Sequence, residues 1–451
     1  MAEPASANVS AQGGAGAFDA YHPPSADLID KCVHCGFCLT TCPTYSLWNE
    51  EMDSPRGRIY LMKLALEGQI ALDQTFVGHM DNCLGCMACM TACPSGVKYD
   101  KLIEATRAQI ERNYHRPLLA GFLRRMMFAL LPRPERLRLL RGPMQIYQRS
   151  GLQALVRRSG LLKLLPASLS AMENLMPSPA SNTNGGVLPE RLEAQGERRL
   201  RVGLLTGCVQ SVFFPEVNAA TARVLAAEGC EVVIPRDQCC CGALMIHTGE
   251  GKEALDYARR NIDAFERARV DAVVINAAGC GSNMKDYGYL LREDSKYAER
   301  AKEFSAKCRD ISEVLATLEP RAARHPIPLK VAYHDSCHLQ HAQAVRTHPR
   351  AVLGKIPGLQ ILEPAEAALC CGSAGIYNLV RPGPAKELGE RKVRNVLATN
   401  PDIVVSGNPG CLLQLRSGLR ASGSELTVVH MVELVDASIR GLPAESLRKR
   451  A

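Results

Sequence analysis

Aromatic residues are scarce in this chain of 451 residues: they make up 5% of it, and Trp48 is the one tryptophan. The chain also lacks an apolar run of about 18 residues, which excludes an integral membrane protein. Its first twenty residues are small and polar, without the basic start and apolar stretch of a secretion signal. These absences predict a cytoplasmic protein.

Nucleotide-binding motifs are absent as well. No G-x-G-x-x-G follows a predicted strand and no P-loop occurs, so we expect no flavin or nicotinamide on this chain. No nucleic-acid-binding fold or aromatic platform is recognisable, which argues against a nucleic-acid partner. Acid-base candidates are limited to His334, His338 and His341. Their spacing allows a metal face or a proton donor, and favours a local hydrogen-bonded cluster.

Cysteine, by contrast, is abundant, with 19 residues. A reducing compartment does not keep structural disulfides, so these thiols are expected to be ligands. The formal net charge of +8 treats every cysteine as neutral. Because metal-bound cysteine is a thiolate, the working charge is expected to be lower.

Eight cysteines form two runs of the pattern C-x2-C-x2-C-x3-C-P. In two-cluster ferredoxins, three cysteines of each such run hold one [4Fe-4S] cluster and the fourth ligates the other. The pattern therefore predicts two clusters with crossed ligands. The first would be held by Cys32, Cys35, Cys38 and Cys93, and the second by Cys42, Cys83, Cys86 and Cys89. The alternative is a pair of zinc sites, for which a crossed fourth cysteine has no use.

The spacer between the runs predicts a helix that begins near Asp53, with Pro55 in its first turn. The cluster module is therefore expected to be mostly helical. Arg56 and Arg58 lie in this helix, where they could tune a cluster potential, contact a partner or simply be solvated.

A second cysteine pattern occurs twice in the carboxyl-terminal half. A cysteine, a Cys-Cys-Gly turn and a final cysteine recur at offsets of 129, 130 and 131 residues, which indicates a duplicated domain. The members are Cys208, Cys240, Cys241 and Cys280 in the first repeat, and Cys337, Cys370, Cys371 and Cys411 in the second. The outer cysteines follow predicted strands, so they would meet at the carboxyl ends of a parallel sheet. Each set is interpreted as a further metal site, a thiol redox site or a group of inert buried cysteines.

The expected fold class is α/β overall, with a mostly helical two-cluster ferredoxin domain followed by a tandem pair of parallel-sheet cysteine-rich domains. The predicted divisions are a disordered leader (1–24), the ferredoxin domain (25–111), a basic helical region and linker (112–199), and the two repeats (200–320 and 328–440).

These motifs resemble the family that joins a helical ferredoxin domain to heterodisulfide-reductase-type Cys-Cys-Gly domains, and more specifically the iron-sulfur subunits of bacterial glycolate oxidase. The strings that carry the resemblance are Cys32-Val-His-Cys-Gly-Phe-Cys38, Pro55-Arg-Gly-Arg-Ile-Tyr-Leu61, Asn218-Ala-Ala-Thr-Ala-Arg-Val-Leu225, Leu339-Gln-His-Ala-Gln343 and Cys370-Cys-Gly-Ser-Ala-Gly375. One departure stands out. The reductase repeats end in C-x-x-C, whereas this chain has Asn283 and Gln414 there, and Cys239 could be a substitute ligand in the first repeat.

The resemblance implies an electron-transfer subunit of a glycolate oxidase (glycolate dehydrogenase) complex. Flavoprotein subunits would oxidise glycolate to glyoxylate, and the quinone pool or the membrane respiratory chain would accept the electrons. The two [4Fe-4S] clusters would be joined by one or two further clusters if the repeats bind metal. The alternatives are a subunit of a D-lactate, 2-hydroxyglutarate or glycerol-3-phosphate dehydrogenase, or a heterodisulfide-reductase-like thiol redox protein.

Positive charge is concentrated in residues 112–163, which hold eleven arginines and one lysine against one glutamate. Apolar residues are interleaved with them, as in a segment that lies on anionic lipid. Peripheral contact with the cytoplasmic face of the inner membrane is one expectation. The other is a helical linker with its apolar side packed inward.

Overall fold

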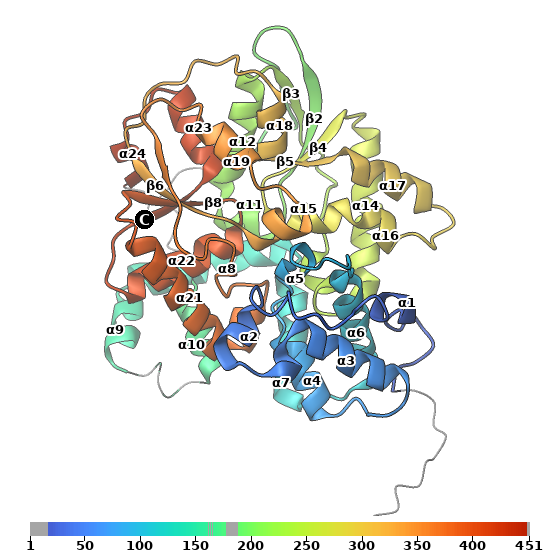
Figure 1. Ribbon diagram of the computed structural model, residues 1–451. Helices are drawn as coiled ribbons and strands as arrows, with labels where there is room; N and C mark the ends of the chain where they lie inside the picture. The colour runs from blue at the N-terminus through green and yellow to red at the C-terminus, as the bar shows by residue number, and fades with distance from the viewer. Residues whose placement is uncertain (1–16, 161, 163, 165, 177–187, 449–451) are drawn as a thin grey trace, which may run out of the picture.

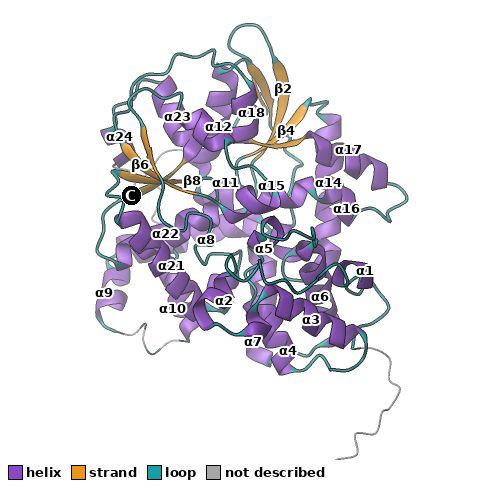
Figure 2. Cartoon of the chain, in the orientation of Figure 1, coloured by secondary structure: helices purple, strands orange, loops and turns teal. Residues whose placement is uncertain are grey.

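The computed structural model describes residues 17–160, 162, 164, 166–176 and 188–448. Helices occupy the amino-terminal part, and strands occur only beyond it in the described chain (Figure 2). The first helices are α1 (Ala26–Ile29), α2 (Pro43–Trp48), the 3-10 turn η1 (Glu51–Asp53), α3 (Pro55–Leu66), α4 (Gln74–Asn82), α5 (Ala88–Thr91) and α6 (Tyr99–Asn113). The expected helical character of this part is confirmed.

Helix α3 begins where the sequence predicts. The Ser54 side chain accepts a hydrogen bond from the Gly57 amide, and Pro55 occupies the first turn, where its missing N–H costs nothing. Gly57 is required there, because a Cβ at this position would lie 2.0 Å from the Glu51 carbonyl oxygen. This close approach fixes η1 against α3.

Residues 17–24 differ from the predicted disordered leader. The Ala17 amide donates to the Ala65 carbonyl, Phe18 packs edge-on against Phe76, and Asp19 accepts hydrogen bonds from Arg112. The prediction is therefore wrong for 17–24, while residues 1–16 lie outside the described residues.

The basic region forms α7 (Leu118–Leu130), α8 (Pro134–Arg149), α9 (Leu152–Arg158) and α10 (Ala167–Asn174). The proline- and serine-rich stretch after them falls largely on residues 177–187, outside the described part. No helix within the described residues is long and apolar enough to cross a membrane.

The first sheet has the strand order β1-β3-β2-β4-β5, and only β1 runs antiparallel. Its strands are β1 (Arg191–Leu192), β2 (Leu200–Leu205), β3 (Cys230–Val233), β4 (Ala272–Ile275) and β5 (Cys308–Asp310). The helices are α11 (Val209–Phe213), α12 (Pro215–Ala227), α13 (Ala243–Ile246), α14 (Gly251–Arg267), α15 (Ala278–Lys285), α16 (Tyr287–Leu290), α17 (Ala298–Lys307) and α18 (Ile311–Thr317).

The second sheet repeats this arrangement in the order β7-β6-β8-β9, all parallel. Its strands are β6 (Lys330–His334), β7 (Gln360–Leu362), β8 (Ile403–Ser406) and β9 (Thr427–His430). The helical segments are the π-helix η3 (His338–Ala342), α19 (His348–Leu353), α20 (Tyr377–Val380), α21 (Pro382–Leu397), α22 (Pro409–Ala421), α23 (Met431–Ile439) and α24 (Glu445–Arg448). The expected tandem α/β architecture is confirmed.

The two sheets share one hydrophobic core. A single cluster of buried side chains runs from Val202 and Leu225 in the first repeat to Val404 and Val435 in the second. Helices α12 and α23 pack against each other, and Arg223 forms an ion pair with Asp436 across this contact. In Figure 1 the two sheets lie side by side. The amino-terminal helices pack on the side of the sheets where α15 lies.

Candidate functional site

The two amino-terminal cysteine runs follow the same backbone path. In the first run His34 and Gly36 have φ values of 53° and 88°, and 51 residues later Gly85 and Met87 have 63° and 61°. Left-handed residues on either side of the second cysteine bend each loop sharply. Such alternating conformations turn backbone N–H groups and side chains toward one centre, which suits a bound cluster.

The four cysteines predicted for the first cluster lie around one small cavity. Cys32, Cys35, Cys38 and Cys93 all line it, together with Cys89 of the other set. Burial and the adjacent Cys93 and Cys35 thiols raise the pKa of Cys32, and burial raises the pKa of Cys38 to about 11. Cys35 is exposed, so this site reaches the surface.

The four cysteines predicted for the second cluster are all buried. Burial and the nearby thiols of Cys86, Cys83 and Cys42 raise the pKa of Cys89 well above its usual range. Burial favours a raised pKa at Cys83 as well, but the nearby Arg58 and Arg107 outweigh it and lower the pKa of that thiol. Buried thiols this close together fit a metal cluster, whose positive iron ions compensate the charge of the thiolates. Cys42, from the first run, is thus a neighbour of Cys89 in the second run, and the crossed assignment stays a prediction.

Arg58 is almost fully buried, since only 1% of its surface is exposed. It lies beside the second cysteine set. Burial would lower its pKa, but Cys83, Tyr99, Cys42 and Asp53 together raise it above its ordinary value. The guanidinium forms a buried ion pair with Asp53 and donates to the His79 carbonyl. A permanent positive charge therefore lies next to Cys83 and Cys42, two predicted ligands, which excludes the solvated alternative for Arg58.

The other arginine, Arg56, is at the surface of the first loop. It donates to the His34 carbonyl at 3.0 Å and forms an ion pair with Glu51. This hydrogen bond stabilises the left-handed backbone conformation at His34 from the solvent-facing side of the loop.

In the first repeat, the outer cysteines follow the central strands β2 and β4. The Cys208 and Cys240 sulfurs lie 3.5 Å apart, and Cys280 is among the groups that raise the pKa of Cys241 well above its usual value. Gly242 has a φ of 82°, which turns the chain so that both adjacent cysteines face inward.

The second repeat gathers the equivalent cysteines after β6 and β8. The hydrogen bond with Cys370 lowers the pKa of the Cys337 thiol, but burial and the other nearby cysteines outweigh it, so the pKa is raised. The hydrogen bond with Cys371 and burial raise the pKa of Cys411 well above its usual range. At Gly372 a Cβ would lie 2.5 Å from the Ala385 carbonyl oxygen, so only glycine lets this turn pack on α21.

The positions that depart from the reductase pattern have structural partners. Asn283 donates to the Cys241 carbonyl at 2.6 Å, and Gln414 donates to the Ala385 carbonyl at 3.0 Å. Each amide therefore stabilises a Cys-Cys-Gly turn or the helix beneath it. The Cys239 thiol donates to the Tyr257 carbonyl, which gives it a backbone partner on α14.

The second ferredoxin loop lies directly against the second repeat. Leu84, Cys86 and Ala88 share one apolar cluster with Cys370, and Cys337 packs against it. Burial, and after it the neighbouring Cys370 thiol, raise the pKa of Cys86 well above its usual range. Two sets of thiols that are far apart in sequence are therefore neighbours in the fold.

Two histidines join these two parts. His338 makes a hydrogen bond of 2.9 Å to the Gly85 carbonyl, and His341 one of 2.8 Å to the Thr91 hydroxyl. The hydrogen-bonded interpretation of these two residues is thus favoured over a metal face formed with His334.

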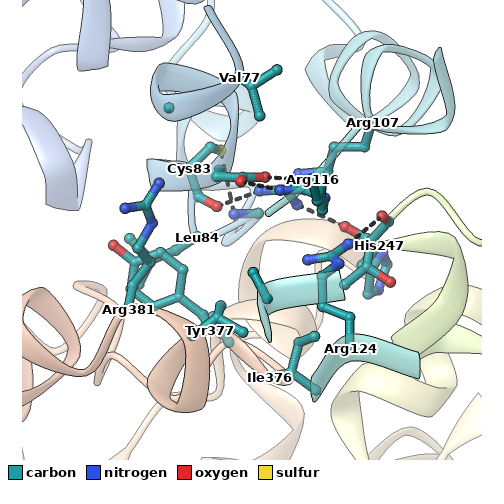
Figure 3. A pocket seen from close by; sticks show the side chains of 18 of the residues that line it. Val77, Cys83, Leu84, Arg107, Arg116, Arg124, His247, Ile376, Tyr377 and Arg381 are labelled. Atoms are coloured by element: carbon teal, nitrogen blue, oxygen red, sulfur yellow. Dashed lines mark hydrogen bonds and ion pairs between the residues drawn. The ribbon is translucent and has the colours of Figure 1, made fainter. Parts of the chain in front are cut away.

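A cavity of about 350 Å³ opens beside Cys83, where α4, α6, α7, α13 and α20 meet (Figure 3). Its apolar walls include Val77, Leu84, Ile376 and Tyr377. Its cationic groups are Arg107, Arg116, Arg124 and Arg381.

The charges around this cavity are only partly neutralised. Arg116 pairs with Asp81 and Glu111, and Arg124 also pairs with Glu111. Within the described residues, no carboxylate pairs with Arg107 or Arg381; Arg107 instead donates to the carbonyls of Cys83 and His247. Sequence patterns could not reveal this cavity, because its walls come from several segments that are far apart in the sequence and no local motif marks it.

Comparisons with known proteins agree with this arrangement. The 4Fe-4S dicluster domain model matches residues 28–97, and the cysteine-rich domain model matches 202–285 and 331–416. The model for the linker region of the glycolate oxidase iron-sulfur subunit matches residues 120–176. The prediction that this chain carries two [4Fe-4S] clusters is thereby confirmed.

Three relatives illustrate the range of similarity. The probable glycolate oxidase iron-sulfur subunit of Bacillus subtilis (strain 168) is 40% identical over 411 residues, 90% of this chain and 93% of the relative. The glycolate oxidase iron-sulfur subunit of Escherichia coli (strain K12) is 37% identical over 417 residues, 91% and 94% of the two chains. A subunit of the CoM/CoB fumarate reductase of Methanothermobacter marburgensis is 34% identical over 237 residues, 52% and 46% of the two chains. The chain therefore belongs to the family of glycolate oxidase iron-sulfur subunits.

Proposed function

We propose that this protein carries electrons from a flavoprotein subunit, which oxidises glycolate to glyoxylate, toward the quinone pool or respiratory chain. Oxidation of glycolate releases two electrons and two protons, which a flavin takes up together. Iron-sulfur clusters accept electrons one at a time, so they split the pair. The tasks of this chain are to hold the clusters, space them and tune their potentials.

The observation that carries this proposal is the contact between the second ferredoxin loop and the second repeat. In our assignment Cys32, Cys35, Cys38 and Cys93 hold the first cluster, and Cys42, Cys83, Cys86 and Cys89 the second. The Cys86–Cys370 contact then places a further thiol site next to the second cluster. The order of sites runs from an exposed cluster, through a buried one, into the repeats.

The exposed cluster is the proposed entrance for electrons. Val33 and Phe37, which flank Cys35, are 67% and 65% exposed, which is unusual for large apolar side chains. A flavoprotein partner that covers them would come close to the first cluster.

The proposed role of each part of the chain follows the divisions that the sequence predicts. Residues 25–111 carry the two clusters, 112–199 connect them to the rest, and the repeats (200–320 and 328–440) supply the further thiol sites. We place the protein in the cytoplasm, at the inner face of the inner membrane.

Substrate and partner are tested by purifying the native complex anaerobically and adding candidate acids. Glycolate is expected to reduce the clusters, with the change followed by electron paramagnetic resonance (EPR). Faster reduction by D-lactate, 2-hydroxyglutarate or glycerol-3-phosphate would contradict the proposed substrate. Reduction by glycolate of this chain alone would contradict the need for a flavoprotein.

We assign the cavity beside Cys83 to the electron acceptor. Its volume lies within the range of small-molecule sites and its walls are apolar. Arg107 and Arg381, which have no carboxylate partner among the described residues, favour the negative charge that a quinone acquires on reduction. His247 lines the cavity, and its Nε2 atom has no hydrogen-bond partner in the described part of the chain, while its Nδ1 binds Glu104 at 2.8 Å.

Filling this cavity is expected to block the acceptor without affecting the donor. Gly78 lines the cavity, and a Cβ added there would meet no atom within 4 Å. The Gly78→Trp variant should raise the KM for a water-soluble quinone about tenfold or more, because loss of about 1.4 kcal/mol of binding corresponds to that factor. Reduction of the clusters by glycolate should be unchanged.

The matched control is Gly78→Ala, which leaves the cavity open and stabilises the helix by about 0.5–1 kcal/mol. Equal quinone kinetics in the tryptophan and alanine variants would place the acceptor elsewhere.

Peripheral membrane contact is proposed through α7. Leu118 and Phe122 are 90% and 58% exposed and lie on one helical face with Arg125. Phe122→Ser is expected to weaken co-sedimentation with anionic vesicles, whereas the equivalent change at exposed Tyr289, on α16, should not. Identical sedimentation of the two variants would assign the face of α7 to a protein contact instead.

A further inference from the structure

His334 is a buried imidazole in the middle of a thiol cluster. It is the last residue of β6 and 2% exposed. One of its ring nitrogens and the sulfurs of Cys371 and Cys411 all lie within 4.8 Å of one another. Neither ring nitrogen has an oxygen or nitrogen partner among the described residues, and the nearest polar group that acts on the ring is the Cys411 thiol. An unsatisfied buried polar group costs about 1–3 kcal/mol, so the position calls for a ligand.

The fold itself does not require a histidine at this position. In the sheet register, His334 pairs with Ser406 as Leu205 pairs with Ile275 in the first repeat. Leu205 is therefore the structural equivalent of His334, and it packs in an apolar cluster that includes Cys241. The same place in the same fold is apolar in one repeat and an imidazole in the other.

The two repeats differ at a second position, and there too the second repeat has the more basic side chain. Ala254 and Ala385 each pack beneath the glycine of a Cys-Cys-Gly turn, which aligns α14 with α21. In that alignment Lys392 of the second repeat replaces Asn261 of the first. Lys392 is 1% exposed and donates to the Glu366 carbonyl, and the nearby Cys371 and Cys370 partly offset the lowering of its pKa by burial. The second repeat thus has basic side chains, an imidazole and an amine, where the first repeat has the neutral side chains of Leu205 and Asn261.

We propose that His334 is a ligand of an iron-sulfur cluster in the second repeat, whose other ligands come from Cys337, Cys370, Cys371 and Cys411. The first repeat offers sulfur ligands only. This inference rests on the proposed role of the second repeat as an electron carrier. Imidazole nitrogen is a good iron ligand, and nitrogen in place of thiolate sulfur raises the potential of iron-sulfur centres.

This ligand set gives electron transfer a direction. The site adjoins Cys86 through Cys370, so it is the neighbour of the buried ferredoxin cluster. Because neutral imidazole contributes no negative charge, the site holds an electron more readily than an all-thiolate site would. Electrons would then move from the ferredoxin clusters into the second repeat in preference to the first.

The test uses the full-length protein, purified without oxygen and labelled with ¹⁵N-histidine. Pulsed EPR of the reduced protein is expected to show histidine nitrogen coupled to one cluster. The His334→Leu variant, which copies the first repeat, should lose this coupling and lower the midpoint potential of that cluster. His341→Gln, a nearby histidine that binds Thr91, is the matched control and should retain both properties.

Three results would overturn the inference. One is a histidine coupling that persists in His334→Leu. Another is iron in the second repeat with no histidine coupling in the wild type, which would leave the proposed electron-transfer role intact. The third is a total of about eight irons per chain in the wild type, unchanged in Cys337→Ser, since two clusters of four irons account for it. That third result would also remove the second repeat from the proposed function. Unchanged signals of the two ferredoxin clusters would show that each variant is folded.

Discussion

Replacing Cys42 by alanine is expected to remove the cluster of the second loop while leaving that of its own loop. Cys42 lies among Cys83, Cys86 and Cys89, although its sequence neighbours belong to the other set. The iron content should fall by about four per chain, since one four-iron cluster is lost. The EPR spectrum of the remaining cluster should match that of Cys86→Ala.

The reciprocal variant tests the same crossed assignment at the other cluster. Cys93→Ala should reproduce the spectrum of Cys35→Ala, because both cysteines line the first cavity. Cys308→Ala is the control: Cys308 is buried, as Cys42 is, but belongs to none of the four sets. If Cys42→Ala matched Cys35→Ala instead, each run would hold its own cluster and the crossed assignment would be wrong.

Removing the buried charge of Arg58 is expected to have the largest effect on stability. Arg58→Met removes the guanidinium that pairs with Asp53, which is 5% exposed and keeps only the Asn82 amide and the nearby His79 ring as partners. Breaking such a buried pair costs about 3–5 kcal/mol of unfolding free energy. Denaturant unfolding of the anaerobic protein, followed by cluster absorbance, measures this loss.

Two further variants separate charge from packing. The double variant Arg58→Met/Asp53→Asn should recover part of the loss, because no unpaired charge remains. Arg56→Met removes a partly exposed pair with Glu51, so its effect should stay below about 1 kcal/mol. A double variant no more stable than Arg58→Met would show that the ion pair is not the cause.

Sequence patterns predict those parts of the site that depend on local spacing. Both cysteine runs, the helix start at Ser54 and the duplicated strands are local patterns, and the structure places them as expected. The partners of Arg58 could not be predicted, since the Thr44 and His79 contacts come from tertiary packing. The prediction of a disordered leader fails at residues 17–24 for a related reason. Small residues suggest disorder, but Phe18 and Asp19 find partners on distant helices.

His334 shows a finer limit of sequence reasoning. Its spacing from His338 allows a metal face formed by the two histidines, but the structure puts His334 at the end of a strand and His338 in the π-helix that follows, bonded to the Gly85 carbonyl. Its real neighbours, Cys371 and Cys411, are brought in by two other segments. Only the register of the two sheets reveals that its counterpart is Leu205.

The core that joins the two sheets has a consequence for how this chain evolves and is engineered. Neither half can be expressed alone or exchanged for a homologous module without exposing the α12–α23 contact to water. We therefore expect the duplicated halves to unfold together rather than one by one. Inside this shared scaffold the two thiol sites differ by single side chains, as at Leu205 and His334, and not by exchanged units.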